Sequence, residues 1–423
     1  MEHARIFKAA SNLFIGNAGS VLISLVNMMI LTRILTTEEM GRYSLFLMVV
    51  TLALTIGLNW SDASIVRHGR EEFVKHKKIN QSFWARAYLF IPILFFIILI
   101  LVIFDNPITA YIGIEKSLII LVVGMFVLNG LVNLITGVLQ SIDQMKKSAY
   151  VLFVQKLIYL GGLLLLLFNA FHTKLSIILL LINISFLLTL VVYSLRFDFK
   201  TILPYKFNKK YLKKIWAFSW PQLFGFSGIY VIHYIDLFVI RKYLGLTDVG
   251  VYSVAYSGFL IIQGMLLLIN TVFMPLIVEY KARKKFNLIK AYIKKIPLML
   301  FSWTALALMG MLLSRFFIPL IFSSKYIASI PSFNVLLIAS IFFIGTACLI
   351  AIMNAFDFII HLQVINLITA ALNVIGDFIL VPKMGIIGAA YATMIALFLS
   401  LVLKIIVVFA KRNVVLGVAS HDN

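Results

Sequence analysis

Long apolar segments dominate this chain and limit what it can fold into. Hydrophobic residues make up 62% of the 423 positions and charged residues 13%, against about 45–50% and about 25% in soluble domains. A run of more than about 18 apolar residues is long enough to cross a bilayer as a helix. Twelve such spans are predicted, at about 10–32, 43–66, 84–104, 117–140, 148–168, 175–195, 216–240, 249–278, 296–322, 332–354, 361–381 and 386–410. The chain is therefore predicted to be an all-α integral membrane protein.

The basic residues are divided unevenly between the two sides that alternating spans define. The formal net charge is +21, and 28 of the 37 Lys and Arg residues fall on one side. By the positive-inside rule this side is cytoplasmic, so both termini are expected in the cytoplasm. The basic loops are expected to contact anionic membrane lipids. They are short and contain no recognition module, so no nucleic-acid partner is predicted.

Two isolated residues receive structural interpretations. Cys348 is the single cysteine and lies within the tenth predicted span, where it is expected to pack rather than react. Lys404 lies near the cytoplasmic end of the twelfth span and is expected to snorkel toward the headgroups.

A sequence repeat divides the chain into two similar halves. Residues 33–46 (RILTTEEMGRYSLF) resemble residues 241–255 (RKYLGLTDVGVYSVA), and residues 174–179 (KLSIIL) resemble residues 383–388 (KMGIIG). The predicted domains are an N-terminal six-helix bundle (1–195), a cytoplasmic basic linker (196–215) and a C-terminal six-helix bundle (216–423). An even number of spans in each half makes the repeats parallel. Two like halves in a membrane are typical of a secondary transporter with its substrate site between them.

Polar side chains inside predicted spans are costly in a bilayer and are therefore candidates for function. The substrate-binding candidates, chosen as amide or cationic groups, are Asn59, Arg67, Asn129, Asn133, Gln140, Lys156, Gln263, Asn270 and Asn373. The ion-coupling candidates, which can change charge, are Asp62, His233, Asp236 and Asp377. Possible hinges in the seventh and eighth spans are Pro221, Gly225, Gly228 and Pro275.

Each candidate also has a structural interpretation. Asp62 can pair with Arg67, and Asp236 can form a local contact with Arg241. Lys156 can snorkel, and His233 can be a hydrogen-bonded packing residue. Stripes of Asn and Gln often join membrane helices, and the Pro and Gly residues can form static kinks.

Three motifs together carry a resemblance to a known family. They are the turn around Gly41 and Gly250, residues 219–241 (SWPQLFGFSGIYVIHYIDLFVIR), and residues 373–390 (NVIGDFILVPKMGIIGAA). In order and spacing they resemble the polysaccharide transporter family, which contains O-antigen and repeat-unit flippases. This family belongs to the multidrug/oligosaccharidyl-lipid/polysaccharide exporter superfamily. The resemblance extends over essentially the whole chain.

The resemblance implies a fold and a function. The two parallel six-helix bundles would form a V-shaped alternating-access transporter in the bacterial inner membrane. It would be a flippase, not an enzyme, for oligosaccharide repeat units of O-antigen, lipopolysaccharide or capsule carried on undecaprenyl diphosphate. Polymerase and chain-length proteins of the pathway would be its partners. No phosphate-cradling P-loop is present, so we expect an H⁺ or Na⁺ gradient to drive transport, with no metal and no other cofactor.

One departure from relatives concerns the cations. The related lipid-II flippases use arginines deep in the central cavity, whereas Arg67, Arg86, Arg241 and Arg315 all lie near the ends of predicted spans. Either the diphosphate is held near the membrane surface, or Lys156 binds it together with hydroxyl or amide groups; Lys156 is the best-placed cation within a span.

Three rival functions remain open. A cation-coupled multidrug exporter of the same superfamily would need deep carboxylates, and this chain has few. A membrane polymerase or ligase of the same pathway would need an outer catalytic surface, and the predicted outer loops are short. A passive scaffold would have no use for polar stripes within its spans.

Overall fold

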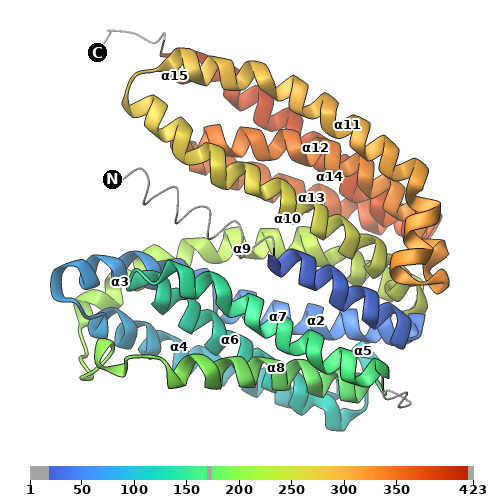
Figure 1. Cartoon of the computed structure of the whole chain (residues 1–423), viewed down its shortest axis with the longest axis horizontal. Helices are drawn as coiled ribbons and strands as arrows, with labels where there is room; N and C mark the ends of the chain where they lie inside the picture. Colours follow the sequence, from blue (N-terminus) through green and yellow to red (C-terminus); the bar gives the residue numbers. More distant parts are fainter. Residues whose placement is uncertain (1–18, 169–173, 418–423) are drawn as a thin grey trace. The chain divides into compact units, whose positions relative to one another are not determined.

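A computed structural model describes residues 19–168 and 174–417, except for the side chains of residues 267, 268, 270–272 and 275. Over these ranges the regular structure is entirely helical. The chain forms two compact units, Met1–Tyr230 (unit 1) and Val231–Asn423 (unit 2) (Figure 1). The boundary between them falls inside one continuous helix, α9 (Lys209–Tyr243). The predicted division into 1–195, 196–215 and 216–423 remains a prediction.

Unit 1 contains the helices that precede this boundary and the first part of α9. After the helix Gly19–Ile34 they are α2 (Thr37–Gly57), η1 (Asn59–Ser61), α3 (Asp62–His76), α4 (Asn80–Ile103), α5 (Asp105–Ile112), η2 (Lys116–Leu118), α6 (Ile119–Ser141), α7 (Met145–Phe168), α8 (Leu175–Leu195) and η3 (Phe199–Thr201). Helix α6 packs against α2, α3, α4, α7 and α8 and is therefore the centre of this unit.

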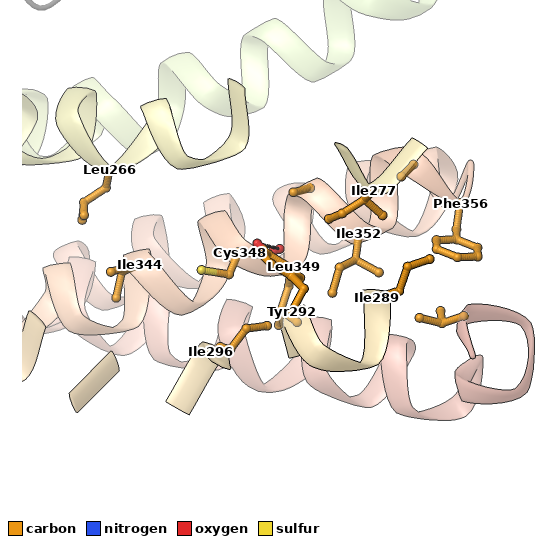
Figure 2. Packing of buried hydrophobic residues seen from close by; sticks show 13 residues of the cluster. Leu266, Ile277, Ile289, Tyr292, Ile296, Ile344, Cys348, Leu349, Ile352 and Phe356 are labelled. Carbon is orange, nitrogen blue, oxygen red and sulfur yellow. Dashed lines mark hydrogen bonds between the residues drawn. The ribbon is translucent and has the colours of Figure 1, made fainter. Parts of the chain in front are cut away.

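Unit 2 contains the end of α9 and the helices that follow. They are α10 (Leu246–Ala282), α11 (Phe286–Phe322), η4 (Ser324–Ser329), α12 (Ile330–Ala355), α13 (Ile359–Met384), α14 (Ile386–Ala410) and α15 (Arg412–Val415). Helix α12 packs against α10, α11, α13 and α14. The core that it shares with α10 and α11 is apolar (Figure 2), and the Tyr292 hydroxyl donates to the Cys348 carbonyl oxygen at 3.2 Å.

The two isolated residues lie inside this unit. Cys348 is fully buried and unpaired, so its predicted packing role is confirmed. Lys404 is also buried, at 1% exposure, and its Nζ lies 2.6 Å from Ser400 Oγ. The expectation that Lys404 snorkels is therefore wrong, because a hydroxyl within the helix bundle accepts from its ammonium group.

The predicted spans correspond to helices of the structure. Eleven helices in the described ranges are long and apolar enough to cross a membrane, and Gly19–Ile34 is a shorter apolar helix. Their positions follow the twelve predicted spans, of which residues 10–18 lie outside the described residues. The all-α membrane prediction is thus confirmed.

The second predicted span, 43–66, differs because it is broken. Helix α2 ends at Gly57, Leu58 leaves helical geometry (φ −124°, ψ −48°), and the chain continues through η1 into α3. Ser61 and Ser64 hydroxyls donate to backbone carbonyls in this break, at 3.2 and 2.6 Å. Irregular backbone at membrane depth is tolerated where it lines a polar cavity. Hydropathy alone does not reveal such a break.

The repeated motifs begin helices. In the first copy, the Thr36 hydroxyl accepts from the Glu39 amide and the Glu39 carboxylate accepts from the Thr36 amide, forming a capping box before α2. In the second copy, Gly245 precedes α10 with φ +142°, a conformation that favours glycine. Gly385 likewise directly precedes a helix, α14, and has a positive φ of +67°.

The basic linker packs on the start of α4. The Ile79 amide donates to the Thr201 carbonyl at 3.0 Å, and the Trp84 indole N–H donates to the Ile202 carbonyl at 3.0 Å. The Asn80 side-chain amide donates to the Pro204 carbonyl at 3.0 Å. These bonds fix residues 201–204 within unit 1, so this part of the linker is not a free tether.

Candidate functional site

A polar pocket of about 560 Å³ opens in unit 1 beside the broken helix. Its lining comes from η1, α3, α6 and the first part of α9: Asn59, Asp62, Ala63, Val66, Arg67, Asn133, Thr136, Gly137, Gln140 and Phe226. Five of the residues predicted from the sequence therefore meet here. Gly137 lets α6 approach α3 closely, because a Cβ atom there would lie 2.9 Å from Ile65 Cγ2.

The amide side chains on α6 retain hydrogen-bonding capacity. Asn133 Nδ2 donates to Asn59 Oδ1 at a long 3.5 Å, and Gln140 Nε2 donates to Ser148 Oγ at 3.0 Å. Each side-chain amide has further donor and acceptor positions. The pocket can therefore exchange hydrogen bonds with a hydroxyl-rich ligand.

Asp62 pairs with Arg86 of α4, and the expected Asp62–Arg67 pair is wrong. Arg86 is only 3% exposed. Its Nε donates to Ser61 Oγ at 3.1 Å, and its guanidinium lies 4.5 Å from the centre of the Phe90 ring. Its Nη1 has no hydrogen-bond partner. Sequence reasoning named Arg86 only as a cation near a span end and did not foresee that the broken helix brings Asp62 and Ser61 to it.

Arg67 has a different environment at the edge of the pocket. Its guanidinium lies 4.9 Å from the centre of the Phe218 ring, and its Nε lies 3.9 Å from Glu71 Oε1. Glu71 also binds the Lys214 ammonium of α9, which lowers the pKa of that carboxyl below its usual range. Burial in turn lowers the pKa of His68, which contacts Phe218.

Two other candidates in unit 1 lie elsewhere. Lys156 Nζ donates to the Ser20 carbonyl at 3.2 Å, and Asn27 Nδ2 donates to the Lys156 carbonyl at 3.2 Å. Lys156 therefore joins α7 to the helix Gly19–Ile34. Asn129 is half-buried one turn before Asn133 on α6, and it does not line the pocket.

A second cluster lies in unit 2 around Asp236 of α9. The Tyr252 hydroxyl of α10 and the Thr393 hydroxyl of α14 both donate to Asp236 Oδ2, the second at 2.9 Å. Asp236 Oδ1 has no hydrogen-bond partner. Tyr252 and Thr393 were not predicted as site residues, although Tyr252 lies in the repeated motif.

Asn373 and Asp377 of α13 complete this cluster. They are four residues apart, both are fully buried, and both interact with Asp236. None of their four side-chain polar atoms has a partner with hydrogen-bond geometry. Two buried carboxyl groups with free oxygen atoms are strongly unfavourable unless a proton or a cation is bound. Carboxylate, amide and hydroxyl oxygens are the ligands that hard cations take, so these residues fit a small cation.

The remaining candidates have varied positions. His233 Nδ1 lies 3.0 Å from the Tyr256 hydroxyl, consistent with the packing interpretation, and Gln263 is buried in α10. Pro221, Gly225 and Gly228 lie in α9 before the boundary at Tyr230, and the helix continues through all three. The side chains of Asn270 and Pro275 lie outside the described residues.

Comparisons with known proteins agree with this architecture. A family model described as "Polysaccharide biosynthesis protein" matches residues 6–281. The capsular polysaccharide biosynthesis protein CapF of Staphylococcus aureus is 25% identical, over 92% of this chain and 96% of its own. An uncharacterized membrane protein of Methanocaldococcus jannaschii is 23% identical over 68% of this chain, and the match spans only 58% of that relative.

Two solved structures share the fold at low sequence identity. The lipid II flippase MurJ, in an inward closed conformation, has a TM-score of 0.76 at 16% identity, with 94% of this chain and 87% of MurJ covered. An inward-facing multidrug resistance MATE family transporter of the MOP superfamily has a TM-score of 0.72 at 15% identity, with 95% and 96% covered. The fold is that of an all-α membrane transporter, and the chain belongs to the polysaccharide biosynthesis protein family.

Proposed function

We propose that this protein is a flippase for lipid-linked oligosaccharide repeat units of O-antigen, capsule or a similar polysaccharide. Membership of the polysaccharide biosynthesis family supports the pathway, and the shared fold supports transport rather than catalysis. The observation that carries the proposal is the polar pocket of unit 1, where side-chain amides and charged groups of η1, α3 and α6 meet.

The pocket has the chemistry that an oligosaccharide requires. Sugar hydroxyls lose their hydration when they enter a bilayer, and amide groups can replace it with hydrogen bonds. Asn59 of η1 and Asn133 and Gln140 of α6 supply such groups to the lining of the pocket. The undecaprenyl diphosphate carrier would keep its chain in the lipid while the sugars cross. The two units would expose the site alternately to each side of the membrane.

We further propose that a cation gradient drives transport through the Asp236 cluster. Asp236, Asn373, Asp377 and Thr393 would hold the cation, either Na⁺ or a proton shared between the carboxyl groups. The buried oxygen atoms without a hydrogen-bond partner, which are Asp236 Oδ1, Asn373 Oδ1 and both carboxyl oxygens of Asp377, support this assignment. Asp62 is less suited to the role because Arg86 already compensates its charge.

The proposed setting is the bacterial inner membrane, with both termini in the cytoplasm. The distribution of basic residues supports this orientation. Polymerase and chain-length proteins of the pathway would take up the translocated repeat units, and surrounding anionic lipids would contact the basic loops.

Reconstituted vesicles test the proposal. Purified protein is incorporated with labelled undecaprenyl-diphosphate oligosaccharide, whose exposure to an external glycan-modifying enzyme is followed with and without a Na⁺ or H⁺ gradient. We expect protein-dependent transfer that a gradient accelerates. Asn133→Leu should slow transfer more than Asn129→Leu, because only Asn133 lines the pocket.

The carboxyl variants separate transport from coupling. Asp236→Asn and Asp377→Asn should transfer substrate without a response to the gradient. Unchanged gradient dependence in both variants would refute the coupling site. Absence of transfer with any oligosaccharide, together with efflux of cationic dyes, would instead identify a multidrug exporter.

A further inference from the structure

An apolar groove lies next to the polar pocket in unit 1. It has a volume of about 290 Å³ and is formed mainly by α4 and α6. Its lining is almost entirely hydrocarbon and aromatic: Leu58, Phe83, Trp84, Ala87, Phe90, Ile91, Leu94, Gly130, Leu131 and Leu134, with Arg86 as the one charged member. Ile91 and Leu131 are 62% and 41% exposed, so the groove is accessible from the bundle surface.

Arg86 connects this groove to the polar pocket. It lines the groove and pairs with Asp62, which lines the pocket. The broken helix makes this possible, because Leu58 belongs to the groove while Asn59, its neighbour, belongs to the pocket. Gly130 lets Leu58 pack closely on α6, since a Cβ atom there would lie 2.3 Å from Leu58 Cδ1.

Arg86 has hydrogen-bonding capacity that the protein does not use. Its Nε and Nη2 bind Ser61 and Asp62, but its buried Nη1 has no partner. A buried donor without an acceptor is unfavourable. A guanidinium group is suited to phosphate oxygens, so an anionic group placed here would use the free donor without breaking the Asp62 pair.

Aromatic residues place Arg86 near one membrane surface. The Trp84 indole donates to the basic linker at Ile202, and the Tyr88 and Tyr205 hydroxyls lie 2.5 Å apart. Trp and Tyr residues gather where the bilayer meets water. In the proposed orientation this is the inner leaflet, where a lipid-linked substrate begins its transfer.

We propose that this groove, hereafter the α4–α6 groove, holds the first isoprene units of the substrate's chain, with the diphosphate at Arg86 and the first sugars in the polar pocket. The assignment rests on the proposed flippase function and names the lipid-binding part of its site. It commits to one occupant, a polyprenyl diphosphate that carries sugars. In that molecule the hydrocarbon chain, the diphosphate and the sugars follow one another. In the protein the apolar groove, the free guanidinium donor and the polar pocket lie in the same order.

Photo-crosslinking tests the assignment. The full-length protein is reconstituted with a polyprenyl diphosphate that carries a diazirine in its isoprenoid chain, and labelled peptides are mapped by mass spectrometry. We expect labels on the α4 and α6 residues that line the groove. A phosphatidylglycerol with a diazirine in its acyl chain serves as the comparison, and it should label the lipid-facing surface without preference for the groove.

Two variants separate the contributions of charge and shape. Arg86→Lys keeps the ion pair with Asp62 but loses the planar fork, so groove labelling by the diphosphate probe should fall about tenfold, as expected for one lost charged hydrogen bond. Leu131→Trp fills the groove and leaves Arg86 intact, and it should reduce labelling similarly. Leu157→Trp on α7 is the matched control at a comparably exposed site, 48%.

The outcomes distinguish the groove from the flippase function. Equal labelling by both probes, or groove labelling unaffected by Arg86→Lys and Leu131→Trp, would overturn the α4–α6 groove assignment. If wild-type protein transfers the oligosaccharide and both variants transfer it equally fast, the flippase proposal stands and the groove assignment fails. If wild-type protein transfers nothing, the flippase proposal fails, whatever the labelling shows.

Discussion

Two equivalent tyrosines show how single residues differentiate the halves of this chain. Tyr43 and Tyr252 occupy the same position of the repeated motif, and both are buried. The Tyr43 hydroxyl lies 3.4 Å from the hydroxyl of Tyr159, whereas the Tyr252 hydroxyl donates to Asp236. The motif places a buried tyrosine in each half. It does not predict the partner, which comes from a helix distant in sequence in the first half and from the preceding helix in the second.

Replacing Tyr252 by Phe should weaken the proposed cation site. The change removes one donor from Asp236 and is expected to destabilise the protein by about 1–3 kcal/mol. It should also reduce the thermal stabilisation that NaCl gives relative to choline chloride. Tyr43→Phe is the matched control, with a smaller loss and an unchanged salt response. Identical behaviour of the two variants would argue against a cation at Asp236.

Helix pairs depend on close contacts that hydropathy does not reveal. Gly388 of α14 lies so near α13 that a Cβ atom there would be 2.4 Å from the Leu380 carbonyl oxygen. Gly161 of α7 has nothing within 4 Å of the same position. Both are glycines in apolar helices, so only the structure distinguishes them.

Alanine substitutions at these two glycines should therefore have opposite effects. Gly388→Ala would force the backbones of α13 and α14 apart. It is expected to lower the free energy of unfolding by about 1–3 kcal/mol, as overpacking does. Gly161→Ala adds a helix-favouring residue in open space and should stabilise by up to about 1 kcal/mol. Thermal unfolding in detergent measures both, and a destabilised Gly161→Ala variant would contradict the assigned packing.

The contact between α3 and α9 should depend on pH through Glu71. The Lys214 ammonium lowers the pKa of Glu71, and His68 and Arg67 also face this carboxyl. Because the pKa of Glu71 is lowered in the folded state, its contact with Lys214 stabilises the folded protein at pH values above the ordinary Glu pKa. This stabilisation is lost as the pH falls through the lowered pKa. Glu71→Gln should speed hydrogen exchange at the start of α9 at neutral pH and make no difference in strong acid. Glu38→Gln, which breaks the exposed pair with Arg42, should leave that exchange unchanged.

At the scale of the whole molecule, the sequence predicted the span pattern well and the site only in part. Apolar length fixes which segments become helices, so over the described residues the predicted spans correspond to helices, apart from the break in the second span. The pocket brings together Asn59, Asp62 and Asn133, whose polarity marks them in apolar spans. The role of Arg86 was missed because it depends on a helix break. Lys156 lies outside the pocket and donates to the Ser20 carbonyl, a backbone partner that a pattern of side chains does not reveal, and its role in substrate binding stays a prediction.

The orientation of the molecule can be tested by cysteine labelling. Replacing Cys348 by Ala removes the native thiol, and Lys116→Cys in η2 and Lys383→Cys in the last turn of α13 then place thiols at exposed positions predicted to lie outside. Both should react with a membrane-impermeant maleimide on intact cells. Lys147→Cys and Lys411→Cys, on the predicted cytoplasmic side, should react only after permeabilisation. Labelling in the reverse pattern would invert the topology.

The docking of the linker on α4 affects how the protein is made. Unit 1 includes residues up to Tyr230, and its contacts with Thr201, Ile202 and Pro204 form only after those residues have left the ribosome. Domains generally fold in order as they are synthesised. When α8, the last long helix before the linker, has been inserted, unit 1 still lacks these contacts and is not yet fully packed. Unit 1 can complete its packing only after the linker and the first part of α9, which also belong to it, have been synthesised.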